Sequence, residues 1–302
     1  MRLLTMRTED NLILGVKTER GVLDVTKAGR LLGKQVPVSL AEVLQNPEEQ
    51  VQALELLVKL AEGSDKGTGK GMNGDRLWLQ EEEIEFAPCV TSPEKILCVG
   101  LNYRKHAEET NHPIPTSPVL FSKFSNALLG HGQTVRLPQE AREFDYEVEL
   151  VIVIGKEAKD VPEAEALSYV FGYTAGNDLS ARDLQMRTSQ WLLGKTCDGF
   201  APLGPYLVTA DEIPNPNSLA LESRVNGEVR QSSNTRDMIF RCASLVSYIS
   251  KHMTLRPGDL IFTGTPEGVV HGYPKDKQVW LESGDEVTVR IDKIGELLTR
   301  LE

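Results

Sequence analysis

The segment FDYEVELVIVIG, residues 144–155, determines how the rest of this chain can be interpreted. Its second half is a continuous apolar run that is typical of a buried strand, yet Glu147 and Glu149 stand where that run begins. Side chains alternate between the two faces of a strand, so these acids share one face and lie about 6.6 Å apart along the chain. Val151 and Val153 continue the same face. One face of the predicted strand therefore carries two acids followed by two valines.

Two interpretations account for this pattern. An edge strand with one solvated face would carry acids without cost. The two valines instead favour a buried face, where each carboxylate costs several kcal/mol unless it is compensated and where like charges repel. Either one acid is then protonated or a cation lies between the two. Oxygen ligands select a hard ion, Mg²⁺, Mn²⁺ or Ca²⁺, over zinc.

A third oxygen ligand is expected from another strand end, and the candidate segment is AGNDLSARDLQ, residues 175–185. Asp178 ends a short predicted strand over 172–178. Ser180 and Asp183 then have the spacing of a capping box, with serine at the N-cap and the acid three positions into a helix. Asp183 therefore has a structural role available, so we expect Asp178 to be the ligand. An ordinary turn is the alternative for Asp178.

The bulk composition excludes several classes of protein. The chain has 302 residues, 40% of them hydrophobic and 25% charged, which is typical of a globular protein with one large or two smaller domains. With 33 basic and 44 acidic residues the net charge is −11, which argues against nucleic acid as a partner. No apolar run approaches the roughly 18 residues of a membrane span, and the charged N-terminal segment is not typical of a signal peptide. No CxxC pair occurs among the four cysteines, so we expect reduced thiols and a cytoplasmic location.

The pattern of strands and turns predicts two domains. Residues 1–90 are expected to form a small α+β domain, with short strands over 1–35 and a helix over 38–62. A surface loop rich in Gly and Lys follows over 63–74, without the spacing of a phosphate-binding loop. Residues 93–302 are richer in strand signals, so the whole chain is predicted to have a β-rich α+β fold.

Within the second domain, the residue pair Asn226-Gly227 predicts a β-hairpin over 223–231. A strand is expected at Lys95–Gly100, and others after the Gly-Asp turns of RPGDLIFTGT and ESGDEVTVRI. The few helices are expected at 162–170, 180–191 and 236–252.

Seven blocks stand in order across residues 93–302: ILCVGLNYRKHAEE, SKFSNALLGHG, FDYEVELVIVIGK, GYTAGNDLSARDLQ, LGKTCDGFAPLGP, RVNGEVRQSSNTRDMIF and LRPGDLIFTGTPEGV. Together they resemble the fumarylacetoacetate hydrolase family, and most closely its bacterial acylpyruvate hydrolases, oxaloacetate decarboxylases and hydroxymuconate-type isomerases. The resemblance implies a mixed β-sandwich-like roll, a homodimer, and Mg²⁺ or Mn²⁺ held by Glu147, Glu149 and Asp178. Fumarylacetoacetases carry a further acid ligand where this chain has Tyr103-Arg104-Lys105, so water and substrate are expected in the remaining coordination positions.

The resemblance also implies the catalytic groups. His106 and Glu109, three residues apart and on one face of any helix there, would be an acid–base dyad on a mobile lid. Lys195 would steady negative charge on an enolate oxygen, and Lys123 would be a second pocket lysine. Without the resemblance, the same residues are typical of a solvated helical turn and of surface lysines.

Three further residues are candidates for substrate binding. Arg182 and Gln185 follow Asp178 on the next predicted helix and could hold a substrate carboxylate, for which the fork of Arg is suited. A structural ion pair is the alternative for Arg182. Thr265, in the turn TGTPEGV, is expected to place its backbone near the same carboxylate, and a plain turn residue is the alternative.

The resemblance implies small 2-keto acids as substrates, because their carboxylate and keto oxygens can chelate one ion. We expect metal-dependent cleavage of a C–C bond, by hydrolysis of acylpyruvates or by decarboxylation of oxaloacetate, through an enolate. An isomerase of the hydroxymuconate type would use the same ligands, so the metal site does not choose between these reactions. The same acids would also suit a protein that binds a 2-keto acid without catalysis, or a purely structural Ca²⁺ site.

Overall fold

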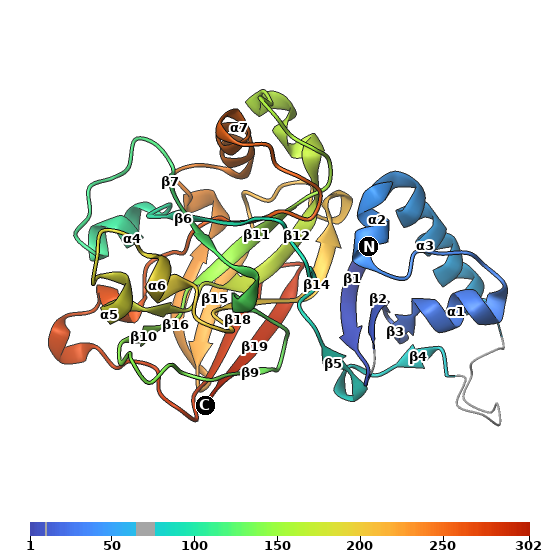
Figure 1. Cartoon of the computed structure of the whole chain (residues 1–302), viewed down its shortest axis with the longest axis horizontal. Coiled ribbons are helices and arrows are strands. Elements are labelled where there is room, and N and C mark those ends of the chain that lie inside the picture. The colour runs from blue at the N-terminus through green and yellow to red at the C-terminus, as the bar shows by residue number, and fades with distance from the viewer. Residues whose placement is uncertain (10, 65–75) are drawn as a thin grey trace.

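The computed structural model describes residues 1–9, 11–64 and 76–302 (Figure 1). Most of the surface loop predicted over 63–74 lies outside the described residues. In the part of the chain that is described, no helix is both long enough and apolar enough to cross a membrane.

In the described part of the first third of the chain, three strands are followed by three α-helices and then by three further strands. Its strands are β1 (Arg2–Arg7), β2 (Leu12–Thr18), β3 (Gly21–Asp24), β4 (Trp78–Leu79), β5 (Glu85–Phe86) and β6 (Ile96–Gly100). Its helices are α1 (Val25–Leu32), α2 (Leu40–Gln45), α3 (Pro47–Glu62) and the 3₁₀ turn η1 (Glu81–Glu83).

The remainder is dominated by strands. They are β7 (Val119–Lys123), β8 (Leu128–Leu129), β9 (Thr134–Val135), β10 (Phe144–Asp145), β11 (Val148–Ile154), β12 (Val170–Asn177), β13 (Ser180–Ala181), β14 (Ala201–Thr209), β15 (Ala220–Val225), β16 (Glu228–Asn234), β17 (Leu260–Phe262), β18 (Glu286–Ile291) and β19 (Gly295–Leu301). The α-helices are α4 (Arg104–Glu109), α5 (Arg182–Gln185), α6 (Leu192–Lys195) and α7 (Cys242–His252). The 3₁₀ turns are η2 (Ser125–Ala127), η3 (Glu163–Tyr169), η4 (Ala210–Glu212), η5 (Thr235–Asp237), η6 (Val270–Gly272) and η7 (Lys275–Lys277).

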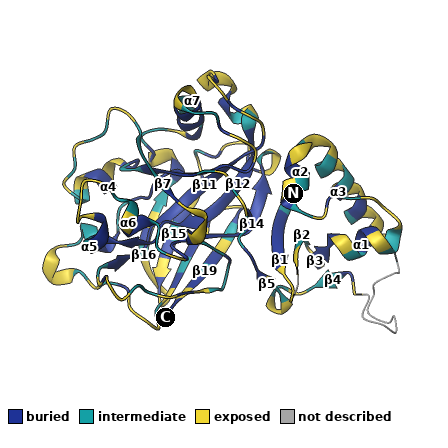
Figure 2. Ribbon diagram, in the orientation of Figure 1, coloured by how far each residue is buried: buried dark blue, intermediate teal, exposed yellow. Residues whose placement is uncertain are grey.

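Strand β11, which follows Glu147, lies in the interior of the large sheet. The sheet has the order β4-β3-β2-β1-β14-β12-β11-β17-β6-β7, and β11 is antiparallel to both neighbours. Every residue of β11 is buried (Figure 2). The edge-strand interpretation is therefore wrong, and the buried interpretation is confirmed.

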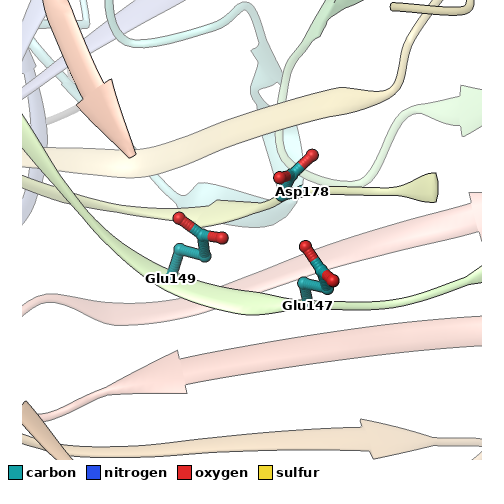
Figure 3. Close-up of side chains that lie close together, drawn as sticks. All are labelled: Glu147, Glu149 and Asp178. Atoms are coloured by element: carbon teal, nitrogen blue, oxygen red, sulfur yellow. The ribbon is translucent and has the colours of Figure 1, made fainter. Parts of the chain in front are cut away.

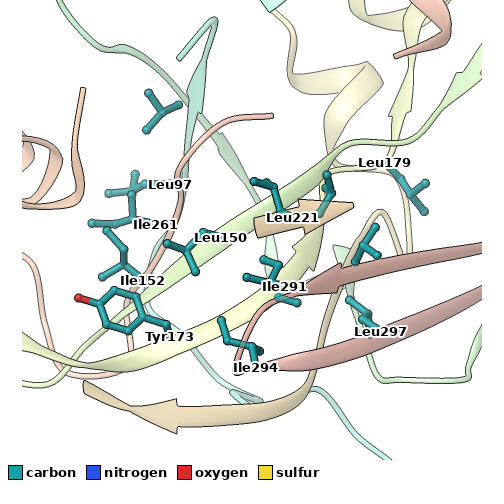
Figure 4. Close-up of a cluster of buried hydrophobic side chains, with 14 of the residues drawn as sticks. Leu97, Leu150, Ile152, Tyr173, Leu179, Leu221, Ile261, Ile291, Ile294 and Leu297 are labelled. Carbon is teal, nitrogen blue, oxygen red and sulfur yellow. The ribbon is translucent and has the colours of Figure 1, made fainter. Parts of the chain in front are cut away.

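The two faces of β11 belong to two different hydrophobic clusters. Leu150 and Ile152 lie in the larger cluster with residues of β15, β18 and β19 (Figure 4). The same cluster includes residues of α7. Val151 and Val153 lie in a second cluster with residues of α1, α2 and α3. The side-chain alternation seen in the sequence thus separates the two cores of the molecule.

A five-stranded sheet with the order β16-β15-β18-β19-β9 provides the second β layer. Strands β15 and β16 form the predicted hairpin, with Asn226 at φ 51° and Gly227 at φ 83°. Two successive positive φ values are the geometry of a type I′ turn. The fold is therefore the predicted β-rich α+β architecture with two β layers.

The structure corrects the expectation for the first 62 residues. Val25–Leu32, predicted within a region of short strands, is a helix, because Asp24 accepts a hydrogen bond from the Lys27 amide (2.9 Å) at its start and Gly33 ends it with φ 63°. The single helix predicted over 38–62 is two helices that meet at Asn46-Pro47. Proline lacks an amide donor and is suited to a helix start, so it begins the second helix there.

The helix predicted over 180–191 is also wrong. Ser180 lies in β13, paired with Asp145, and its hydroxyl donates to the Asp178 carbonyl (3.0 Å) rather than capping a helix. Asp183 accepts from the Arg142 amide (2.8 Å) instead of closing a capping box. Only Arg182–Gln185 is helical before α6, because tertiary strand pairing overrides the local capping signal.

Two other predicted helices are shorter than expected. The segment predicted over 162–170 is the 3₁₀ turn η3, and α7 begins only at Cys242 within the predicted 236–252. The predicted boundary near residues 90–93 is crossed by the large sheet, since β1 pairs with β14. Whether residues 1–90 fold as a separate domain stays a prediction.

Replacement of Ile152 by Ala tests the role of β11. This side chain is fully buried between β12 and β17, so the free energy of unfolding should fall by about 2–5 kcal/mol. Val229→Ala, at a 43% exposed position of β16, is the control and should cost less than about 1 kcal/mol. Denaturant unfolding measures both, and equal losses would contradict the central position of β11.

Candidate metal centre and acid–base site

Three acids meet where β11 begins and β12 ends. Glu147, Glu149 and Asp178 each present one oxygen such that the three oxygens lie within 4.8 Å of one another (Figure 3). All three side chains are buried. The pairing of the two strands produces this convergence, and the Asp178 amide donates to the Glu147 carbonyl (2.9 Å).

Buried cations compensate two of these three carboxylates. Lys195 Nζ donates to Glu147 (2.7 Å) and to Asp178 (2.9 Å). Lys123 Nζ lies 2.6 Å from the other oxygen of Asp178. Arg182 Nη2 donates to the second oxygen of Glu147 (2.6 Å). Glu147 and Asp178 are therefore each paired with two positive charges.

Asp145 is a fourth buried acid at this site and was not among the predicted residues. It accepts hydrogen bonds from Arg182 Nε (2.9 Å) and from the amides of Val270 (2.8 Å) and His271 (3.0 Å). The sequence did contain a signal, because Asp145 stands two residues before Glu147 and continues the same alternation of acids.

The four buried acids face three buried cations, which leaves one negative charge in excess. Glu149 carries this excess, because among the described residues its carboxylate accepts a hydrogen bond only from the Gly264 amide (2.7 Å) and no cation contacts it. Burial and the charges of Asp178 and Glu147 raise the pKa of Glu149 well above its usual value. Burial also tends to raise the pKa of Glu147, but the charges of Lys195 and Arg182 outweigh it and the net pKa is lowered.

This donor set fits a hard divalent cation. Such an ion would supply the positive charge that Glu149 lacks, and all candidate ligand atoms are carboxylate oxygens, which suit Mg²⁺ and Mn²⁺. A structural Ca²⁺ would use the same atoms, so the geometry of the oxygens alone does not distinguish these ions.

The predicted dyad is assembled on α4. His106 Nδ1 lies 2.9 Å from one carboxylate oxygen of Glu109, and the Gly268 amide donates to the other oxygen (2.9 Å). A Cβ atom on Gly272 would lie 2.5 Å from the carboxyl carbon of Glu109, so only glycine leaves room for this acid. A carboxylate on Nδ1 fixes the tautomer of the imidazole and leaves Nε2 available for proton transfer.

His106 and the three acids line one cavity of about 40 Å³. A water molecule needs roughly 10–15 Å³ by the same measure, so the cavity as it stands holds only a few small groups. The other polar side chains in its wall are Thr110, His112, Arg182, Gln185, Lys195, Thr265 and His271. Its apolar wall includes Val99, Leu101, Phe121, Met186 and Trp191.

Two predicted substrate-binding residues are occupied by structural contacts. Lys123 does not line the cavity; besides Asp178 it contacts the carbonyls of Leu179 (3.0 Å), Phe200 (2.7 Å) and Lys195. Arg182 lines the cavity, but its three nitrogens bind acids and the Gln185 amide oxygen. These contacts favour the structural ion pair for Arg182 and a role for Lys123 in holding Asp178.

The remaining two candidates differ. The Thr265 hydroxyl donates to the Val148 carbonyl (3.0 Å) and accepts from Gln231 (2.8 Å), so it fixes the turn that carries Gly264. Gln185 is buried in the cavity wall, with its amide oxygen bound to Arg182 at 3.0 Å. Their roles in substrate binding stay predictions.

Comparison with known proteins identifies the class. Residues 95–302 match the family described as Fumarylacetoacetate (FAA) hydrolase C-terminal, and the chain belongs to this family. Oxaloacetate tautomerase Fahd2a, mitochondrial, of Rattus norvegicus is 45% identical over 224 residues, which are 74% of this chain and 71% of that protein. The chain is therefore an enzyme of this family, and the interpretation as a binding protein without catalysis is not supported.

Two solved structures of the same family carry other activities in their names. The 5-carboxymethyl-2-hydroxymuconate delta-isomerase of Mycobacterium smegmatis is 31% identical, with a TM-score of 0.72 over 100% of this chain and 98% of that one. Fumarylpyruvate hydrolase of Pseudomonas aeruginosa, in complex with Mn²⁺ and pyruvate, is 37% identical, with a TM-score of 0.64 over 72% of this chain and 91% of that one.

The uncompensated charge of Glu149 predicts how metal and pH affect stability. Because its folded pKa is raised, the metal-free protein should lose stability as pH rises from the ordinary value of 4.5 through the folded pKa. Glu149→Gln removes this loss, so the metal-free variant should melt at a higher temperature than the wild type at pH 8. Adding Mn²⁺ at 100 times its Kd should stabilise the wild type by about 2.7 kcal/mol and the variant by much less.

Thermal denaturation at pH 5 and pH 8, with and without Mn²⁺, measures these effects. Glu282→Gln, at an exposed position, is the matched control and should behave as the wild type. Equal stabilisation of the wild type and Glu149→Gln by Mn²⁺ would show that Glu149 is not a ligand.

Proposed function

We propose that this enzyme interconverts the keto and enol forms of a short 2-keto acid, with oxaloacetate as the substrate. The observation that carries the proposal is the position of His106, which lines the same cavity as the three acids and is held by Glu109. A proton acceptor beside a candidate chelation site suits proton transfer at the carbon next to the keto group. The name of the rat relative supports oxaloacetate in particular.

A divalent ion at the three acids would act as a Lewis acid on the carboxylate and keto oxygens of the substrate. In the ketonised substrate, His106 Nε2 removes a proton from C3 while the C2 oxygen gains negative charge. The His106 imidazolium then returns this proton to the C2 oxygen, directly or through a water molecule, which completes the enol and restores the neutral imidazole; the reverse steps regenerate the ketone. Glu109 stabilises the imidazolium of His106, and the buried charge of Lys195 lies in the cavity wall where it lowers the energy of the enolate.

Cleavage of a C–C bond, the reaction expected from the sequence, is the second candidate. Decarboxylation of oxaloacetate passes through the same enolate, and hydrolysis of an acylpyruvate adds a water that His106 would activate. The relative that was solved with Mn²⁺ and pyruvate supports this candidate.

The remaining assignments stay part of this proposal. Mg²⁺ or Mn²⁺ would be the ion, and a homodimer is expected from the family. A cytoplasmic location was expected from the sequence, whereas the rat relative is named as mitochondrial.

Replacing His106 by Gln tests the proton-transfer role. The rate of enol-oxaloacetate decay, followed by ultraviolet absorbance with Mn²⁺, should fall by about 10²–10⁴-fold. Mn²⁺ affinity measured by calorimetry should be unchanged, because His106 is not one of the three acids. The surface substitution His252→Gln is the control. Pyruvate formation from oxaloacetate and from acetylpyruvate is measured in parallel, and release of pyruvate without enol decay would favour the cleavage candidate.

Gly272→Ala tests whether Glu109 must be held in place. The new methyl group would occupy the position of the Glu109 carboxyl, so the carboxylate must move away from His106. A displacement of about 1 Å can reduce turnover about 10²-fold, and we expect a loss of this order with Mn²⁺ affinity retained. Gly63→Ala, where the nearest atom would lie at 3.5 Å, should retain full activity. Full activity of Gly272→Ala would exclude a role for the Glu109 position.

A further inference from the structure

We infer that His271, together with Gln185, recognises the carboxylate at the far end of a 2-keto diacid and so selects dicarboxylic substrates. The inference rests on the proposed function and identifies the second carboxylate of the substrate as the group that these two side chains would bind. His271 was not among the residues predicted from the sequence.

Three polar side chains of the cavity wall are already engaged by other groups of the protein. Lys195 is bound to two acids, Arg182 to two acids and an amide oxygen, and Thr265 to a carbonyl and an amide. In the described part of the chain, neither the His271 ring nor the Gln185 NH₂ group has an assigned hydrogen-bond partner. Both side chains line the cavity.

The orientation of the Gln185 amide follows from its neighbour. Arg182 Nη1 can only donate, so the atom 3.0 Å away must be the amide oxygen of Gln185. The NH₂ group is consequently the end of the amide that remains free to donate to a ligand. Gln185 is 6% exposed and lines the cavity, so this donor lies in the wall of the site.

The backbone around His271 is fixed on both sides. The adjacent amides of Val270 and His271 donate to the two oxygens of Asp145, and Gln278 donates to the His271 carbonyl (3.2 Å). The backbone of the turn that carries the ring is therefore fixed. A fixed backbone loses little entropy when a ligand binds.

Charges of both signs surround the His271 ring. Burial and the nearby positive charge of Arg182 lower the pKa of the imidazole, with His112 acting in the same direction, while Asp145 and Glu147 oppose it. The ring is then neutral near pH 7 and offers one N–H donor. The N–H of the His271 ring and the NH₂ group of Gln185 can each donate a hydrogen bond to a carboxylate. A methyl group or an alkyl tail accepts no hydrogen bond and gains nothing from these donors.

The experiment compares two ligands that differ only in the far group. Malate and 2-hydroxybutyrate both chelate through a carboxylate and a 2-hydroxyl group, but only malate has a second carboxylate. Binding of each to the Mn²⁺-loaded enzyme is measured by calorimetry for the wild type, His271→Ala, His271→Gln and the surface control His252→Ala. A hydrogen bond to a charged group is worth about 10–100-fold in affinity.

The wild type should prefer malate by at least about 10-fold, His271→Ala should lose this preference, and His271→Gln, which keeps an N–H donor, should retain part of it. Affinity for 2-hydroxybutyrate should be the same in all four proteins. Equal affinities for the two ligands in the wild type, or an unchanged preference in His271→Ala, would overturn the inference. Because neither ligand is a keto acid, a failure of the tautomerase proposal would appear in the enol assay and not here.

Discussion

The excess negative charge at Glu149 is the constraint on which the site depends. Glu147 and Asp178 are neutralised by buried Lys and Arg side chains, whereas Glu149 meets only a backbone amide among the described residues. A buried carboxylate in this position is unfavourable until it is protonated or joined by a cation. The free-energy cost of burying this carboxylate stays small because the surrounding cations leave only one charge uncompensated. A site with one uncompensated charge can bind a cation and release it again without unfolding.

One loop connects the separate parts of the site. Residues 264–272 donate backbone hydrogen bonds to Glu149, to Glu109 and to Asp145, and Asp145 in turn binds Arg182. This single backbone segment therefore holds a candidate metal ligand, the His106–Glu109 dyad and the turn that carries His271. Because backbone amides supply these contacts, their positions depend on the path of the loop and on the glycines within it.

Alternation along residues 147–153 was sufficient to predict a strand with two acids on one face, because the period of two is a local property of the backbone. The two valines favoured burial of that face over a solvated edge strand, and the order of the sheet decides it. The ends of short elements were not predictable in this way. Ser180 has the chemistry of a helix cap, but its pairing with Asp145 in a strand is a tertiary contact. The partners of Lys123 and Arg182 likewise depend on segments far apart in sequence, and only the fold brings them together.

The pairing of β1 with β14 has a consequence for the integrity of the enzyme. If the first residues of the chain were cleaved away, β14 would present unpaired backbone amides and carbonyls along the stretch that now bonds to Arg2 and Leu3. An uncovered strand of this kind readily recruits a strand from another molecule. Proteolytic removal of β1 would therefore be expected to cause aggregation even though it removes no residue of the candidate active site.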